Sequence, residues 1–361
     1  MSKKSRVREI QFLPINVDEG SVRHLSALKP SPDTFRLVSW NTLADQYTHY
    51  HETERPNVDR EVFTQYRRHK LLGRTFQHFV DIDVDFICLQ EVDFKIARET
   101  LVDTNAYTRL LTPTGHGRRG DTRVDACCIF YKSIDWRIVG IAEIVNLDDL
   151  TSKGQAFRRG NFGIIASFQH KSIPNKTLVI CNTHLYWNPE YEYVKLHQAH
   201  YLCTKARSTL NRLAEQGTET HLIFCGDLNS KPGGLVHTYM TKGEAFIEDC
   251  PSFGQTRFRC PVYDLSMKSI HAKRDDKGSL TTEEYIQYTN ATADFCGVID
   301  YIFHPTSLLL TKVLSFPTIK SNVYGRKEPI LPTKGWGSDH LAIGAEFSFS
   351  SEQTHQSSVT K

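Results

Sequence analysis

The sequence predicts an α/β protein in which two β-sheets pack against each other and helices cover their outer faces. Three observations lead to this fold class. Short apolar runs of strand length recur along the chain, two long stretches have helical periodicity, and no glycine-rich phosphate loop follows any run. Many strands with few long helices fit two packed sheets better than a strictly alternating barrel. The 361 residues, 39% of them hydrophobic, are enough to bury a large core.

The predicted elements follow from the apolar patterns in chain order. Alternating or continuous apolar runs predict strands over 35–40, 84–89, 126–131, 162–168, 177–183, 221–225, 298–303, 308–316 and 341–349. Apolar residues at helical spacing predict helices over 60–80 and 191–215. Two polar segments, 45–59 and 252–289, are expected to be long loops.

The two ends of the chain differ in composition from its middle. Residues 1–33 are polar and basic, and we expect a leader that is loosely packed or disordered. Residues 34–350 carry the strand and helix patterns of a single domain. Residues 351–361 are rich in Ser, Thr, Gln and His without an apolar face, which is typical of a disordered tail.

Composition also narrows the setting in which the protein works. No apolar run approaches the roughly 20 residues that span a bilayer, so we expect no membrane partner and no secretory signal. Most of the nine cysteines lie inside apolar runs, which favours free thiols in a reducing compartment. The expected location is intracellular, cytoplasmic or nuclear by default, with a mitochondrial one still open. The net charge of +3 neither requires nor excludes a polyanionic partner.

Several predicted strands end on polar side chains that suit a metal or a phosphate. If neighbouring strands of two sheets end on the same rim, these side chains converge on one pocket. Each residue alone is more often a turn former or a structural histidine, but six such strand ends together are not a turn signature. The set comprises Asn41, Gln90, Glu91, Asn182, Thr183, His184, Asp227, Asn229, Asp300, Ser338, Asp339 and His340.

This set contains the groups that phosphodiester chemistry needs. Mg²⁺ prefers oxygen ligands from one or two carboxylates, which Glu91, Asn41 and a second carboxylate would supply. An Asp300–His340 pair would orient the imidazole and stabilise its charged form. Asp227 would position an attacking water. Asn and His donors at the rim would stabilise charge on the phosphate.

Six motifs in order carry a resemblance to a known family. They are SWNTLAD (39–45), ICLQEVD (87–93), NTHLYWNPE (182–190), GDLNSKP (226–232), YTN with FCGVIDYIF (288–290 and 295–303), and SDHLAI (338–343). This series resembles the deoxyribonuclease-I-like endonuclease/exonuclease/phosphatase superfamily. It most resembles the carbon-catabolite-repressor-type deadenylase branch, which includes Nocturnin, the Angel proteins and the 2'-phosphodiesterases.

The resemblance implies a four-layer α/β sandwich of two packed mixed sheets flanked by helices, with a catalytic domain over 34–350. It implies a metal site with Glu91 as the carboxylate, Asn41 close by and Asp339 assisting. The ions would be Mg²⁺, with Mn²⁺ as the alternative, and two of them are expected.

The same resemblance assigns the catalytic roles. Asp227 and Asn229 would activate or place the nucleophile and hold phosphate. His184 would contact the phosphate, and Asp300 with His340 would form a buried acid–imidazole pair.

Four further positions are expected to bind substrate. In deadenylases of this branch an aromatic ring and a proline clamp the terminal base, and Phe295 and Pro189 match those positions. Lys195 matches a basic position that meets phosphate, and Asn161 is expected to reach the cleft. Phe295 as a core residue and Lys195 as an exposed helical lysine are the alternatives.

The resemblance implies a phosphodiesterase acting on RNA 3' ends, with poly(A) as one candidate. The first hypothesis is a 3'-to-5' exoribonuclease that releases 5'-mononucleotides. A 2',5'-oligoadenylate phosphodiesterase, an RNA 2',3'-cyclic phosphatase, an abasic-site DNA endonuclease and a non-catalytic RNA-binding protein are the alternatives. No leucine-rich repeats precede the first motif, so docking into large decay complexes is not expected.

Overall fold

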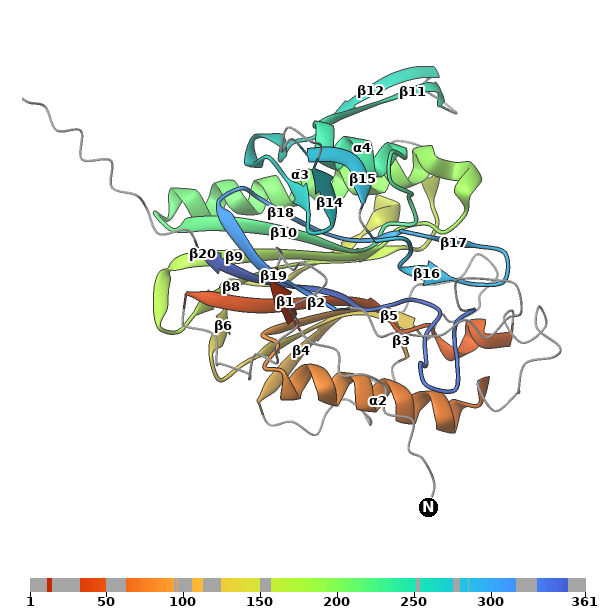
Figure 1. Cartoon of the computed structure of the whole chain (residues 1–361). Coiled ribbons are helices and arrows are strands. Elements are labelled where there is room, and N and C mark those ends of the chain that lie inside the picture. Colours follow the sequence, from red (N-terminus) through yellow and green to blue (C-terminus); the bar gives the residue numbers. More distant parts are fainter. Residues whose placement is uncertain are drawn as a thin grey trace, which may run out of the picture.

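Two seven-stranded sheets packed between helices form the body of the molecule (Figure 1). The structure is a computed structural model, and it describes residues 12–14, 33–49, 63–93, 96, 106–112, 125–149, 157–250, 254–274, 280–284, 286–315 and 330–349. Both sheets contain parallel and antiparallel pairs. The predicted two-sheet α/β fold class is confirmed.

The first sheet has the strand order β1-β19-β20-β2-β3-β5-β4. β2 and β3 run parallel with Asn41 opposite Gln90, so the two polar ends meet at one edge. The long helix α2 covers the outer face, where Phe76 and Phe79 contact Phe130 and Trp40. The elements are β1 (Phe12–Pro14), β2 (Thr34–Asn41), α2 (Gln65–Asp81), β3 (Phe86–Asp93), β4 (Tyr107–Leu111), β5 (Asp125–Lys132), β19 (Leu308–Leu314) and β20 (Ile343–Phe349).

The second sheet has the order β13-β18-β10-β9-β8-β6, and β7 also pairs with β8. β9 and β10 run parallel with His184 opposite Asp227, and β18 places Asp300 opposite Asp227 on the other side. Helices α3 and α4 cover its outer face. The elements are β6 (Trp136–Ile138), β7 (Glu143–Asn146), β8 (Phe162–His170), β9 (Ile173–His184), α3 (Glu192–Glu215), β10 (Glu219–Asp227), α4 (Leu235–Lys242), β13 (Lys268–Ser269) and β18 (Asp300–His304).

An apolar layer between the sheets holds them together. Phe86 of the first sheet meets Phe168 of the second at 5.0 Å between ring centroids, within a cluster of fully buried side chains from both sheets. Burial of such apolar surface is the main stabilising contribution to the fold. The packed layer fixes the relative position of the two rims on which the polar strand ends lie.

The expected long loop over 252–289 is wrong, because this segment contains short strands. β12 (Gly254–Arg259) pairs with β11 (Glu244–Cys250), and β14 (Ala272–Arg274) pairs with β15 (Leu280–Glu284). These hairpins satisfy their backbone hydrogen bonds locally, with no long apolar run to reveal them. The remaining short elements are η1 (Asp45–Tyr47), η4 (Leu147–Asp149), η7 (Pro189–Tyr191), η8 (Tyr263–Leu265), β16 (Asn290–Ala291) and β17 (Cys296–Gly297).

Some predictions differ from the structure at element boundaries. The helix predicted from residue 60 begins at Gln65, and residues 60–62 lie outside the described residues. Within the leader, Phe12–Pro14 add an edge strand to the first sheet, and its other residues up to 32 are not described. The predicted tail and positions 50–59 of the first loop also lie outside. Among the helices of the described residues, none has the length and apolarity of a membrane span.

The contribution of one buried histidine, His304, to the free energy of unfolding should fall as the pH drops below 6.5. Burial lowers the pKa of His304 from 6.5 to about 4, so the folded protein holds it neutral while the unfolded chain takes up a proton. Its stabilising contribution is fully present above pH 6.5 and is lost as the pH falls from 6.5 to about 4. Between pH 7 and pH 5 this residue should account for a loss of about 2 kcal/mol in the free energy of unfolding.

Urea unfolding of the wild type and of His304→Gln at both pH values measures this effect. The variant removes the titration and keeps a polar side chain. Its free energy of unfolding should change less between pH 7 and pH 5 than that of the wild type. An equal change in both proteins would contradict the assignment.

Candidate active site

The rims of the two sheets meet where a single amide nitrogen joins two carboxylates. Asn41 Nδ2, fully buried at the end of β2, donates to Glu91 Oε1 at 2.9 Å and to Asp227 Oδ2 at 3.0 Å. Glu91 belongs to the first sheet and Asp227 to the second. The structure therefore brings the ends of β2, β3 and β10 together in one site, as the strand ends predicted.

Glu91 reaches this position through a β-bulge. In the pairing of β3 with β5, the register shifts between Leu89 and Val92, and Glu91 has a left-handed backbone with φ 52°. That conformation is costly for a residue with a side chain and recurs at functional sites. The bulge turns the carboxylate toward Asn41, and the Ala44 amide holds its second oxygen at 3.0 Å.

Asp227 lies at the centre of the site between two imidazoles. Its Oδ2 is 3.6 Å from His184 Nε2 and 3.6 Å from His340 Nε2. Burial raises the pKa of Asp227 and the neighbouring Asp300 raises it further, while the two histidines and Asn41 oppose the shift. A buried carboxylate with a raised pKa is a good proton acceptor near neutral pH.

Asp300 and His340 form the predicted acid–imidazole contact. His340 Nδ1 lies 2.8 Å from Asp300 Oδ2, and Thr289 Oγ1 donates to the same oxygen at 2.6 Å. Burial alone would lower the pKa of His340, but Asp300, Asp339 and Asp227 outweigh it and hold the pKa well above its usual value. The arrangement keeps a positive charge next to Asp227.

Asp339 lies beside this pair. Its Oδ1 is 3.9 Å from His340 Nε2, and its Oδ2 accepts a hydrogen bond from Asn290 Nδ2 at 3.2 Å. The structure thus places Asp339 next to the imidazole. Its predicted role in assisting a metal stays a prediction.

Asn229 supports Asp227 from the turn after β10. The Asn229 backbone has φ 49°, its amide donates to Asp227 Oδ1 at 3.0 Å, and its Nδ2 donates to the Leu185 carbonyl at 3.1 Å. Asparagine adopts the left-handed conformation more readily than most residues. The turn fixes one oxygen of Asp227 and leaves the other facing the histidines.

Lys195 is neither exposed nor directed at the rim. Its side chain is 1% exposed, and Nζ donates to Glu192 Oε1 and to the Asn229 carbonyl, both at 2.6 Å. The alternative of an exposed helical lysine is therefore wrong. The ammonium group holds the Asn229 turn in place through the Asn229 carbonyl. Its predicted contact with phosphate has no support in this arrangement.

Asn161 supports the site through the backbone of His184. Its Nδ2 donates to the His184 carbonyl at 2.9 Å, and its Oδ1 accepts from Gln198 Nε2 at 3.1 Å. Asn161 therefore fixes the backbone that carries His184. Its predicted substrate contact stays a prediction.

Phe295 and Pro189, the predicted base clamp, are not part of the hydrogen-bonded cluster of carboxylates and histidines. Phe295 lies in the turn between β16 and β17, is only partly buried, and has the Lys231 ammonium 5.1 Å from its ring centroid. Pro189 begins η7 and is exposed. The partial exposure of Phe295 disfavours the core alternative, and its stacking on a base stays a prediction.

The donor set fits a hard divalent cation. Glu91 and Asp227 oxygens share one amide nitrogen, so they lie within about 6 Å of each other. Ligand atoms of Asp227, Asp300 and His340 lie within 4.8 Å of one another, and the buried Asp300 Oδ1 has no hydrogen-bond partner. Oxygen-rich sites with unsatisfied carboxylate atoms suit Mg²⁺ or Mn²⁺.

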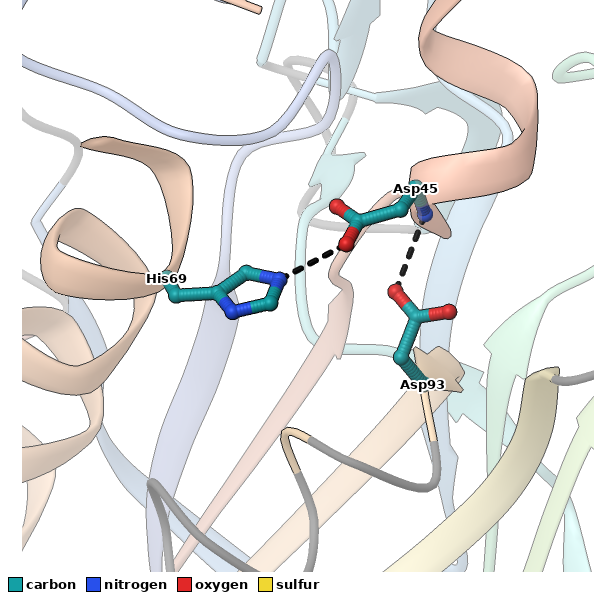
Figure 2. Close-up of side chains that lie close together, drawn as sticks. All are labelled: Asp45, His69 and Asp93. Atoms are coloured by element: carbon teal, nitrogen blue, oxygen red, sulfur yellow. Dashed lines mark hydrogen bonds and ion pairs between the residues drawn. The ribbon is translucent and has the colours of Figure 1, made fainter. Parts of the chain in front are cut away.

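A second acidic cluster lies behind the site and has a structural explanation. His69 Nε2 lies 2.7 Å from Asp45 Oδ2, and the Asp45 amide donates to Asp93 Oδ2 at 2.9 Å (Figure 2). The fully buried Arg68 pairs with the other oxygen of Asp45. Burial raises the pKa of Asp45, but His69 and Arg68 outweigh it and lower the pKa. A buried guanidinium among these carboxylates already supplies the positive charge.

Two supporting interactions were not predicted from the sequence. Arg68 donates to the carbonyls of Thr42, Leu43 and Gly337, which anchors the turn after β2 to helix α2. Gln90 Nε2 donates to Asn182 Oδ1 at 2.7 Å and links the two sheets under the site. A lone arginine in a helical pattern gives no sign in the sequence of the first interaction.

The Asp300→Asn variant should lower the pKa of His340. It removes one of the three carboxylates that favour the protonated imidazole, while an amide oxygen can still accept from Thr289. Nuclear magnetic resonance titration of the histidine ring signals in metal-free protein measures the change. An unchanged His340 titration would show that Asp300 does not set its charge.

The Lys195→Met variant should destabilise the protein by about 1–3 kcal/mol, because the buried Asn229 carbonyl loses its donor. Lys205→Met is the matched control on the same helix. Lys205 is 37% exposed and pairs with Glu143 at the surface, so its loss should change the free energy of unfolding by less than about 1 kcal/mol. Equal effects of the two substitutions in urea unfolding would argue against the supporting role of Lys195.

Two solved structures with a similar fold are those of ANGEL2 and of the Nocturnin catalytic domain. ANGEL2, described as a 2',3'-cyclic phosphatase and solved with adenosine-2',3'-vanadate, aligns with a TM-score of 0.67 at 22% identity, covering 88% of this chain and 96% of that one. The human Nocturnin catalytic domain with bound sulfate aligns with a TM-score of 0.61 at 18% identity, covering 94% and 98%. At these identities the likeness establishes the fold alone.

Sequence relatives lie in the predicted branch. The CCR4-Not complex 3'-5'-exoribonuclease subunit Ccr4 of Yarrowia lipolytica is 26% identical over 89% of this chain, which spans 49% of that protein. The carbon catabolite repressor protein 4 homolog 4 of Arabidopsis thaliana is 27% identical over 87% of this chain and 77% of its own length. The predicted resemblance is confirmed. The sequence profile described as the endonuclease/exonuclease/phosphatase family matches residues 38–340, and the chain belongs to that family.

Proposed function

We propose that this protein is a Mg²⁺-dependent phosphodiesterase that shortens RNA from its 3' end and releases 5'-mononucleotides. The observation that carries the proposal is the Asn41 bridge, which sets Glu91 beside a buried Asp227 flanked by two imidazoles. This combination offers a metal carboxylate, a proton acceptor and imidazole hydrogen-bond donors within one site. Hydrolysis of a phosphodiester by water needs these three functions together.

In this mechanism Asp227 accepts the proton of the attacking water through Oδ2. Its raised pKa suits that role, and the Asn229 amide holds its other oxygen so that Oδ2 keeps one direction. An imidazole on each side limits where the water and the phosphate can lie. The alignment of water with phosphorus would then come from fixed side chains.

His340 and His184 stabilise charge on the phosphate. The three carboxylates around His340 keep it protonated, so its Nε2 can donate to a phosphate oxygen. His184 Nδ1 lies 3.8 Å from Glu91 Oε1, which places its ring between the two carboxylates. A magnesium ion bound by Glu91 would neutralise part of the charge that develops on the phosphate oxygens.

RNA is the proposed substrate because of the named activity of the Yarrowia relative, a 3'-5'-exoribonuclease subunit. The predicted clamp of Phe295 and Pro189 would suit a terminal base, and adenylate ends are one candidate. A reducing, intracellular setting agrees with the free thiols of the described residues, seven of which are buried. The 2',5'-oligoadenylate and 2',3'-cyclic phosphate substrates are competing outcomes of the same experiment.

A panel of 5'-labelled oligoribonucleotides tests the proposal. It contains A-tailed, U-tailed and untailed RNA, 2',5'-linked adenylate, RNA with a 2',3'-cyclic phosphate end, and a DNA duplex with an abasic site. Incubation with Mg²⁺ should give a ladder that shortens from the 3' end, and chelation should abolish it. If only a different oligonucleotide of the panel is cleaved, RNA 3'-end shortening is contradicted and that oligonucleotide represents the substrate class.

The Glu91→Ala and Glu91→Gln variants should each lose at least about 10²-fold in rate, because both remove the metal carboxylate charge. Glu91→Gln keeps the side-chain size and an acceptor for the Ala44 amide, so it serves as the control for folding. Glu143→Gln, on the surface pair with Lys205, should retain full activity. A Glu91→Gln protein as active as the wild type would contradict the proposed metal role.

A further inference from the structure

One large aromatic side chain next to the site is exposed to solvent. Of the four tryptophans, Trp40, Trp136 and Trp336 are 1–2% exposed, whereas Trp187 is 63% exposed. Trp187 follows His184 by three residues and precedes Pro189 by two. An exposed indole has no packing role that would explain its size, so its surroundings decide what it does.

A row of aromatic rings supports Trp187 from behind. The Tyr186 ring lies 5.9 Å from the Trp187 ring, and Tyr186 and Tyr191 lie 5.8 Å apart. The guanidinium of Arg159 lies over both tyrosines, 4.8 Å from the Tyr186 centroid and 5.0 Å from the Tyr191 centroid. Stacking of this kind holds the arginine and the rings in fixed places.

This aromatic and basic surface, made of Tyr186, Trp187, Tyr191 and Arg159, is tied to the site by one glutamine. Gln198 Oε1 accepts from the Tyr186 amide at 2.9 Å, and Gln198 Nε2 donates to Asn161 at 3.1 Å. Asn161 in turn holds the carbonyl of His184 at 2.9 Å. The backbone on either side of Leu185 that leads to Trp187 is therefore held in a fixed position relative to His184.

The turn that carries Arg159 is fixed as well. The amides of Arg159 and Gly160 donate to Asp148 Oδ1 at 2.7 Å and 2.9 Å. The Asp148 carboxylate is thus occupied by backbone donors. Arg158, the preceding residue in the chain, is exposed, and Glu190 is an exposed acid in the segment that carries Trp187.

Aromatic rings and arginines beside a phosphate-binding site suit single-stranded nucleic acid. Bases stack on such rings with little regard to sequence, and arginine contributes through its charge and its planar stacking. A protein surface that binds an apolar partner would need a larger apolar patch than one indole. The chemistry on this surface therefore favours a nucleobase as the ligand.

We propose that Trp187, supported by Tyr186 and flanked by Arg159, is a stacking subsite for a nucleobase of the RNA strand next to the reacting phosphate. This subsite is separate from the predicted clamp of Phe295 and Pro189. It deepens the proposed function, because it rests on RNA as the substrate. It also assigns a role to the aromatic residues of the NTHLYWNPE motif, which the carboxylate chemistry does not use.

Binding without turnover tests the subsite directly. Wild-type protein in chelator is titrated with a short oligoribonucleotide, and both tryptophan emission and anisotropy of the labelled RNA are followed. Trp187→Leu should weaken binding by about tenfold and abolish the quenching of tryptophan emission. Trp187→Phe should retain most of the affinity because it keeps an aromatic face.

Phe246→Leu is the matched control. Phe246 is 45% exposed and faces Arg257 across the β11–β12 hairpin, so it is also an exposed aromatic beside an arginine. Its substitution should leave RNA affinity unchanged. Replacing one nucleotide at a time by an abasic ribose should reveal a position at which wild type and Trp187→Leu bind equally, and that position is the stacked base.

Hydrolysis of a dinucleotide in which both bases are replaced by hydrogen separates the two proposals, because this diester carries no aromatic ring. Trp187→Leu should hydrolyse it at the wild-type rate. If Trp187→Leu hydrolyses this diester and binds RNA as tightly as the wild type, the proposed subsite is wrong and the proposed phosphodiesterase stands. The exposed indole would then fit a protein partner. Loss of RNA affinity in Trp187→Leu, without hydrolysis of any substrate by the wild type, would support the subsite and overturn the proposed enzyme.

Discussion

The site depends on one constraint, which is that carboxylates from two different sheets must lie close together in a buried place. Glu91 and Asp227 would repel each other there if nothing intervened. The neutral Asn41 amide reduces this repulsion by donating one hydrogen bond to each carboxylate. Its own oxygen accepts from the Leu43 amide at 3.0 Å, which fixes which end of the side chain faces the acids. Asparagine supplies two donors without a charge of its own.

A second pair of amides keeps the sheets in register beneath that bridge. Gln90 donates to Asn182, and Asn182 Nδ2 donates to the carbonyls of Leu89 and Cys128 at 3.1 Å and 3.0 Å. Hydrogen bonds between buried amides are directional, whereas the contacts of the apolar layer around them are not. The apolar layer provides the stabilisation and the amides specify one relative placement of the rims. The left-handed backbone of Glu91 persists because these contacts surround it.

Sequence reasoning could locate the strands and their polar ends because period and composition are local properties. The structure brings Asn41, Glu91, Asp227, Asp300 and His340 together, although their roles stay predictions. The burial of Lys195 could not be read in the same way, since an isolated lysine in a helical pattern is usually exposed. One of its two partners, the Asn229 carbonyl, lies more than thirty residues away, and only the tertiary structure shows that contact. Short elements such as α4 escaped for a related reason, because eight residues give little periodicity.

Charge balance explains why the supporting cluster of Arg68 lies where it does. The site concentrates carboxylates at one rim, and Asp45 and Asp93 add two more just behind it. Burial lowers the pKa of Arg68, and Asp45, Asp93, Asp339 and Glu91 all oppose that shift, so the guanidinium interacts with both groups of acids. Its hydrogen bonds to the Thr42 and Leu43 carbonyls hold the turn after β2 in place. The Ala44 amide of that turn donates to the Glu91 carboxylate. The same buried arginine therefore offsets the negative charge and fixes the backbone that presents the metal carboxylate.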